Sequence, residues 1–152
     1  MTRILRLTHE YPFPADRVWQ VATDLDHLRR VTERMLAFRD LPSGRIHAGQ
    51  VLEVEVSLFG RLPYQPYRMT VEALDDAAMW FQSDETGAGV TVWRHRLQVV
   101  PTGTGSRIEE QIEIGAGLAT PLFLLWARVM YRARHKPRLR LLDTLTNGGA
   151  DA

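Results

Sequence analysis

The residue best suited to chemistry in this sequence is a histidine, His95. Residues 90–100 alternate between apolar and polar side chains, which is typical of a half-buried strand. His95 lies in the apolar row, together with Trp93, Leu97 and Val99. An imidazole can gain or lose a proton near neutral pH, so an inward-facing histidine can hydrogen-bond a ligand or act as a general acid or base.

A glutamate in the next expected strand is placed to meet this histidine. Within residues 106–114, Glu110 belongs to the same row as three isoleucines, Ile108, Ile112 and Ile114. A hairpin centred near residues 102–104 places His95 directly opposite Glu110 or on its diagonal, and both positions are within reach of long side chains. The sequence therefore predicts a histidine–carboxylate pair inside an otherwise apolar shell.

Two interpretations of this pair remain open. His95 and Glu110 can satisfy each other as a structural pair, because buried polar groups need partners. Alternatively, they line a ligand cavity in which Glu110 sets the tautomer of His95 and raises its basicity. In that second case the pair anchors a bound molecule or, if the protein is an enzyme, supplies its catalytic residues.

A sheet built mainly of hairpins is expected to position these side chains. Alternating segments of strand length are separated by short turns rich in glycine, proline and aspartate. We expect strands at residues 3–11, 35–41, 50–59, 67–74, 79–84, 90–100 and 106–114. Short turns favour antiparallel pairing, so we predict a curved antiparallel sheet of about seven strands.

Helices are expected between the first two strands and at the C-terminal end. Two short amphipathic helices are predicted, one over residues 15–23 and one that begins at an N-cap on Asp24. A long helix is predicted over residues 120–145, with a kink or break at Pro137. Its buried face is predicted from apolar residues spaced three and four apart: Leu122, Leu125, Trp126, Val129, Met130 and Ala133.

These elements together predict an α+β fold in which the sheet wraps around the long C-terminal helix and the two short helices plug one end. Residues 1–147 are expected to form a single domain, and residues 148–152 a flexible tail. A curved sheet and one helix often leave more room than their side chains fill, so an internal cavity is expected. Its predicted ligand-binding residues are Tyr67, Met69, Trp93, His95, Leu97, Glu110, Trp126 and Met130.

Composition excludes several classes of protein. The 152 residues include no cysteine, so disulfides, thiolate zinc sites and cysteine nucleophiles are excluded. Five histidines show no metal-site spacing, and we expect neither a metal nor a cofactor. A net charge of +1 without a nucleic-acid motif argues against nucleic-acid binding. Without a recognisable signal peptide or membrane span, we expect a cytoplasmic protein.

The basic stretch from Arg128 to Arg140 in the long helix is also open to more than one interpretation. It can be a solvated helix face. It can also form a peripheral contact with anionic lipid headgroups, with the apolar turn at residues 122–126 entering the interface. The same apolar turn can instead pack against a second copy, so a monomer and a homodimer both remain possible.

Several short motifs, in this order along the chain, carry a family resemblance. They are Pro14–Trp19, Thr23–Leu28, Gly49–Val51, Trp93–His95 and Glu109–Ile114. With the order of elements, they resemble the START-related, polyketide cyclase and lipid-transport superfamily (SRPBCC), and most closely its bacterial ligand-binding branch. In that branch a Trp-x-His strand precedes a strand with an inward acidic residue, and the matching residues here are Trp93, His95 and Glu110.

The resemblance implies the helix-grip fold and a cavity, without identifying a substrate. It implies a small, largely hydrophobic ligand such as a lipid, an aromatic polyketide-like molecule or an isoprenoid. The alternative that it implies is a cofactor-independent cyclase or dehydratase in which His95 moves protons.

Overall fold

The computed structural model describes residues 1–150, with side chains as far as residue 147. One sheet contains the strands β1 (Arg3–Tyr11), β2 (Leu36–Arg39), β3 (Val51–Leu58), β4 (Gln65–Asp75), β5 (Trp80–Gly87), β6 (Val92–Thr102) and β7 (Gly105–Gly115). The helices are α1 (Ala15–Ala22), α2 (Leu25–Thr32), the short 3-10 helix η1 (Gly117–Ala119), α3 (Thr120–Ala133) and α4 (His135–Ala150). Every predicted strand is present, and its ends differ from the prediction by at most three residues.

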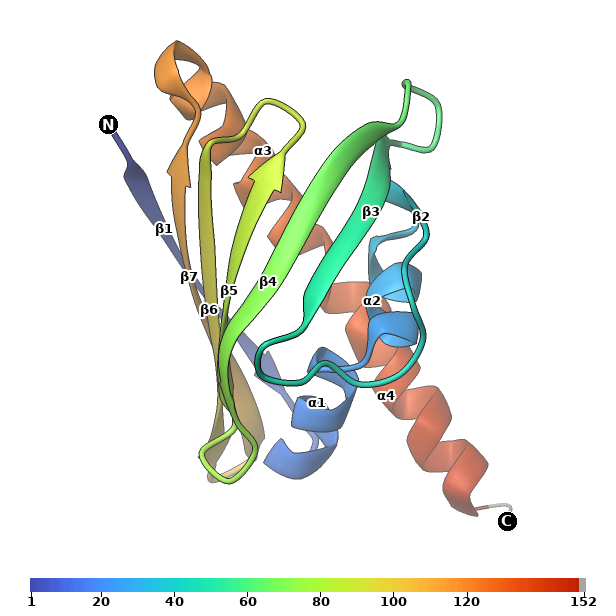
Figure 1. The fold of residues 1–152 in the computed structure, drawn as a ribbon. Helices are drawn as coiled ribbons and strands as arrows, with labels where there is room; N and C mark the ends of the chain where they lie inside the picture. The colour runs from blue at the N-terminus through green and yellow to red at the C-terminus, as the bar shows by residue number, and fades with distance from the viewer. Residues whose placement is uncertain (151–152) are drawn as a thin grey trace.

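The sheet is antiparallel throughout and has the order β1-β7-β6-β5-β4-β3-β2. Tight turns or short loops join most sequential strands. The first strand, β1, lies at one edge of the sheet and pairs with the last strand, β7, so that Leu7 lies opposite Glu110. The sheet curls, and the C-terminal helices run along its concave side (Figure 1). The predicted α+β helix-grip architecture is confirmed.

The two short helices close one end of the curved sheet (Figure 1). α2 begins as predicted, because the Asp24 carboxylate accepts hydrogen bonds from the backbone N–H groups of Asp26 and His27. α1 buries Val18 and Trp19 against the sheet. The indole N–H of Trp19 still finds a partner, since it donates to Asp76 at 2.8 Å.

The C-terminal helix breaks earlier than predicted. The break lies at Arg134, between α3 and α4, whereas the sequence suggested Pro137. Pro137 is instead accommodated in the first turn of α4, where a residue without an N–H is tolerated because that N–H would have no partner within the helix. α4 continues to Ala150 and so enters the segment 148–152 that was expected as a tail; residues 151 and 152 lie outside the described residues.

The buried face of α3 also differs from the prediction. Leu122, Leu125 and Val129 are 67%, 56% and 49% exposed. Met130 is buried as predicted, and the other residues that turn inward are Thr120, Ala127 and Tyr131. At 100° per residue, the true buried face is turned by roughly a third of a turn from the predicted one.

The apolar core is divided among three clusters that surround a central space. One joins α1 and α4 to the ends of β5, β6 and β7, and includes Phe81 and Leu97. A second joins α3 to β1, β6 and β7, and includes Trp93 and Met130. The third joins α2 to β3 and includes Leu52. The named members also line the space between the clusters, so the core encloses this space without filling it.

Candidate functional site

A cavity of about 540 Å³ lies between the concave face of the sheet and the helices. Strands β3 to β6 provide one wall and α2, α3 and α4 the other. This volume falls within the range of small-molecule binding sites. The cavity lies in the region where the order of elements predicted one.

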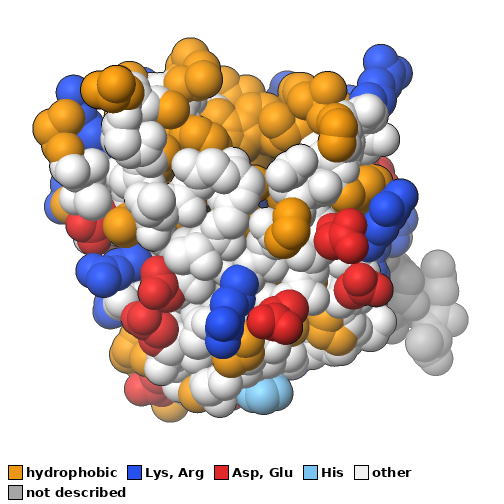
Figure 2. Space-filling view, turned by 45° about the horizontal axis from the view of Figure 1, so that its top comes forward, with side chains coloured by type: hydrophobic (Ala, Val, Ile, Leu, Met, Phe, Trp, Pro, Cys, Tyr) orange, Lys and Arg blue, Asp and Glu red, His pale blue; other side chains and the backbone are white. Residues whose placement is uncertain are grey.

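The open end of the cavity has an apolar rim. Exposed residues from the end of β3, from the β3–β4 connection and from the start of α3 lie there, among them Leu58, Leu62 and Leu122. Trp126 packs edge-on against Phe59, with ring centres 5.6 Å apart, and so joins the two sides of this rim. Figure 2 shows hydrophobic side chains gathered around a recess at this end of the molecule.

His95 and Glu110 form the predicted pair. His95 lies opposite Ile112 and Glu110 opposite Leu97, so the two side chains meet on a diagonal of the β6–β7 ladder. The Nε2 of His95 lies 2.6 Å from Oε2 of Glu110, and both side chains are buried. Since a carboxylate accepts, Nε2 carries the proton that is donated to Glu110. Nδ1 is left without a hydrogen-bond partner among the described residues.

Glu110 is held in its charged form. Burial by itself raises the pKa of a carboxyl group, but the hydrogen bond and charge of His95, helped by Arg138 and Arg134, outweigh it and lower the pKa of Glu110 to about 2. Its second oxygen, Oε1, is buried without a hydrogen-bond partner. Glu110 therefore acts as a fixed negative charge behind the imidazole.

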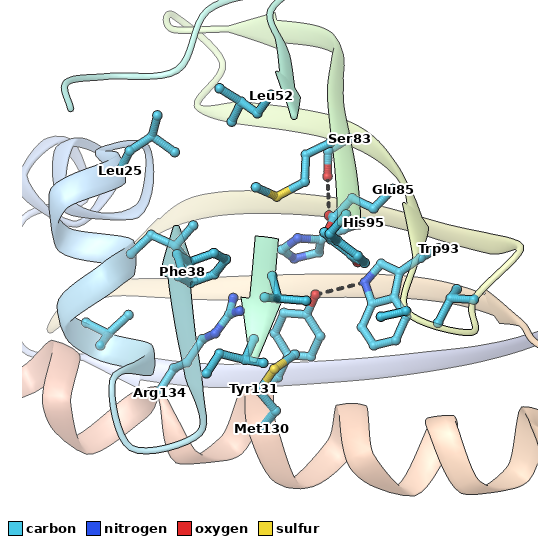
Figure 3. A pocket seen from close by; sticks show the side chains of 18 of the residues that line it. Leu25, Phe38, Leu52, Ser83, Glu85, Trp93, His95, Met130, Tyr131 and Arg134 are labelled. Carbon is cyan, nitrogen blue, oxygen red and sulfur yellow. Dashed lines mark hydrogen bonds between the residues drawn. The ribbon is translucent and has the colours of Figure 1, made fainter. Parts of the chain in front are cut away.

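Tyr131 connects the histidine to the helix side of the cavity. Its ring centre lies 5.0 Å from that of His95, and its hydroxyl accepts a hydrogen bond from the Trp93 indole N–H at 3.1 Å. Burial raises the pKa of Tyr131 above its usual value, so the phenol stays neutral. Figure 3 shows Tyr131 and Met130 rising from the helix toward His95 and Trp93 on the sheet.

A second buried carboxylate lies on the sheet side. Glu85 accepts hydrogen bonds from the Tyr67 hydroxyl at 2.9 Å and from the Ser83 hydroxyl at 2.8 Å. Burial and the nearby Glu85 charge raise the pKa of Tyr67 well above its usual value. The interior is therefore more polar than the apolar shell that the sequence suggested.

Two arginines complete the polar part of the wall. Arg134 lies at the break between α3 and α4, and Arg138 lies one turn later. Both are buried and line the cavity, whereas Arg128, Arg132 and Arg140 on the same helices are exposed. The basic stretch is thus divided between the interior and the surface.

The structure brings together the residues predicted to bind a ligand. The residues on the cavity wall are Tyr67, Met69, Trp93, His95, Leu97, Trp126 and Met130. Glu110 lies behind His95 and reaches the cavity through it. Their role in binding stays a prediction.

Two further properties of the described residues bear on the kind of site. Among residues 1–147, no three histidine, aspartate or glutamate side chains are grouped so that they could hold a metal ion. None of the helices in the described part of the chain is long and apolar enough to span a membrane.

Comparison with known proteins places the sequence in a family. Residues 10–142 match the family described as "Domain of unknown function (DUF8410)". The chain belongs to this family. No curated protein matches this DUF8410 chain.

Solved structures share the fold of this DUF8410 chain at low sequence identity. A START superfamily protein from Mycobacterium smegmatis has a TM-score of 0.70 and 13% identity, over 93% of this chain and 98% of that one. The Zhui aromatase/cyclase from Streptomyces sp. R1128 has a TM-score of 0.70 and 13% identity, over 95% of each chain. Norcoclaurine synthase from Thalictrum flavum, in complex with dopamine and hydroxybenzaldehyde, has a TM-score of 0.65 and 18% identity, over 93% and 87%. The helix-grip fold predicted from the sequence is confirmed.

Sequence reasoning missed polar residues of the DUF8410 cavity, among them Glu85, Tyr131, Arg134 and Arg138. Glu85 was missed because the predicted strand ended at Asp84, although Phe81, Ser83 and Glu85 continue one alternating row. Tyr131, Arg134 and Arg138 were missed because the helix face was assigned by hydrophobicity. A signal was available: the buried residues recur at helical spacing, as Ala127, Met130, Tyr131, Arg134, Arg138, Leu141 and Leu142.

Proposed function

We propose that this protein binds a small, largely hydrophobic molecule, such as a lipid, an aromatic polyketide-like compound or an isoprenoid, in the internal cavity. The observation that carries the proposal is the unfilled volume of about 540 Å³ between apolar walls, with an apolar rim at its open end. Space of this kind reduces packing stabilisation, so a well-folded chain that keeps it is expected to use it.

Particular side chains are assigned to particular parts of the ligand. Trp93, Leu97 and Met130 provide apolar surface around its body. His95 provides a polar anchor, because Nε2 is engaged by Glu110 while Nδ1 can accept a hydrogen bond from a hydroxyl group or, when the ring is protonated, donate one to a carbonyl group. Glu110 positions the ring and does not itself line the cavity.

Two measurements test binding. Mass spectrometry of the denatured, freshly purified protein is expected to detect a co-purified hydrophobic molecule. The uncharged dye Nile red is expected to gain fluorescence in the cavity, and His95→Ala is expected to weaken its binding only modestly, since most of the contact area is apolar. Absence of both a co-purified molecule and dye binding would contradict the proposal.

A cyclase or dehydratase activity is the second candidate. It is favoured by the buried His95–Glu110 pair beside Tyr131, because a positioned imidazole next to a neutral phenol can move protons on a carbonyl compound. The test is turnover of a short polyketone. An enzyme is expected to lose at least about a hundredfold in kcat/KM on His95→Ala if His95 is its general acid or base.

A third outcome is expected if His95 and Glu110 have only a structural role. If His95→Ala lowers the melting temperature while neither ligand binding nor turnover is found, the pair serves stability alone. Nile red binding, polyketone turnover and thermal unfolding measured on the same preparations separate the three outcomes.

A further inference from the structure

Two arginine side chains lie on the cavity wall among mostly apolar neighbours. Arg134 is 8% exposed and Arg138 5% exposed. A buried guanidinium is unfavourable unless acceptors take up its five N–H groups. The partners of these two side chains therefore indicate what they are for.

Arg134 has no hydrogen-bond acceptor or ion-pair partner for its side chain within residues 1–147. Its Nε is buried and unpartnered. The guanidinium carbon lies 4.5 Å from the centre of the Tyr131 ring, a cation–π contact that leaves the N–H groups free. Figure 3 shows the guanidinium projecting from the helix into the cavity, between Phe38 and Tyr131.

Arg138 is better satisfied but still incomplete. One of its terminal N–H groups donates to the Tyr11 hydroxyl at 3.2 Å. Its Nε is buried without a partner, and no carboxylate in the described part of the chain lies within ion-pair distance. Arg138 therefore adds a second positive charge to this part of the wall.

The buried carboxylates near the cavity are already engaged by other groups. One oxygen of Glu110 is bound by His95, and both oxygens of Glu85 accept from Tyr67 and Ser83. The second oxygen of Glu110 has no hydrogen-bond partner, and Arg134 and Arg138 favour its charge from a distance without contacting it, so the Arg134 guanidinium stays open toward the cavity. A guanidinium offers paired N–H groups that match a carboxylate.

We propose that the ligand is an amphipathic organic acid whose carboxylate is bound by Arg134, with Arg138 as the second cation. This inference rests on the proposed hydrophobic-ligand function and adds the chemical class of the ligand. The apolar body of the acid extends toward the rim at the start of α3. Leu122 on that rim is twelve residues from Arg134, which corresponds to roughly 18 Å along the helix.

The test compares matched probes with the same apolar body, one ending in a carboxylate and the other in an uncharged hydroxyl group. Binding of decanoate and of decanol is measured by isothermal titration calorimetry, and naphthoate is compared with naphthalenemethanol to cover an aromatic body. The wild-type protein is expected to bind each acid at least about tenfold more tightly than its alcohol, because a hydrogen-bonded ion pair is added to the same apolar contact.

Three variants test which residue is responsible for the tighter binding of the acid. Arg134→Gln is expected to remove most of it, and Arg134→Lys to keep part of it, since lysine retains the charge without the planar fork. Arg128→Gln is the matched control, because Arg128 is an exposed arginine on the same helix, and it is expected to keep the full preference.

Each result is decisive. Equal binding of acid and alcohol would overturn the inference and leave the proposed hydrophobic-ligand function intact. Binding of neither probe pair would contradict the proposed function and, with it, this inference. A preference that survives Arg134→Gln would overturn the assignment to Arg134. The wild-type comparison needs no variant, so it remains decisive even if Arg134→Gln does not fold.

Discussion

His95 and Glu110 meet at 2.6 Å across the diagonal of two neighbouring strands, and both side chains are buried. The pair links the cavity to the sheet, because His95 lines the cavity while Glu110 lies behind it. The contribution of the pair to the free energy of unfolding can therefore be measured separately from ligand binding.

Removing the charge of Glu110 is expected to destabilise the protein. Glu110→Gln keeps an oxygen that can accept from His95 but removes the buried charge of the carboxylate, and loss of a charge-assisted hydrogen bond costs about 1.5 to 3 kcal/mol. The free energy of unfolding in urea measures this loss. Glu109→Gln is the control, since Glu109 is half-exposed on the other face of β7, and a change below about 1 kcal/mol is expected there. Equal losses in both variants would contradict a special role for the pair.

Acid is expected to weaken the same interaction. The pKa of Glu110 is lowered to about 2 in the folded state from an ordinary value of 4.5. The carboxylate therefore contributes its full stabilisation above about pH 4.5, and this contribution is lost as the pH falls toward 2. Urea unfolding between pH 2 and 6 is expected to show a steeper loss for the wild-type protein than for Glu110→Gln. Parallel curves would show that Glu110 is not the group responsible.

Filling the cavity is expected to abolish binding with little effect on folding. Met69 lines the cavity, so Met69→Trp places a larger side chain in unoccupied space. Nile red affinity is expected to fall at least about tenfold, while the melting temperature changes little because the added atoms enter the unfilled cavity. Arg68→Trp adds the same side chain at the adjacent exposed position and is expected to leave affinity unchanged. Equal affinity in Met69→Trp and the wild-type protein would place the dye outside the cavity.

The exposed apolar residues of α3 are expected to contact an anionic lipid surface. Leu122 and Leu125 are more than half exposed, and the exposed Arg128 and Arg132 follow on the same helix. We expect co-sedimentation with phosphatidylglycerol vesicles, reduced by the Leu122→Ser/Leu125→Ser double variant and by added salt. Vesicles of neutral phosphatidylcholine are the control. A dimer in size-exclusion chromatography without vesicle binding would assign this surface to a second copy.

The sheet could be predicted from the sequence because each strand is specified by a local pattern of residues. Alternation of apolar and polar residues marks each strand, and turn residues separate the strands. The His95–Glu110 pair followed from the same rule, since both residues interrupt apolar rows in strands joined by a short hairpin, which fixes their register.

The orientation of the C-terminal helix was decided by tertiary structure. The sequence offers two faces, one with Leu122, Leu125 and Val129, and one with Ala127 and Tyr131 followed by Arg134. Hydrophobicity favours the first face, yet the second one turns inward, where its polar groups reach a cavity that exists only after the sheet has curled. Helical spacing determines which residues share a face, whereas packing against the sheet determines which face is buried. The sequence by itself therefore determined the elements and the histidine–carboxylate pair; the inward arginines depend on how the helix meets the sheet.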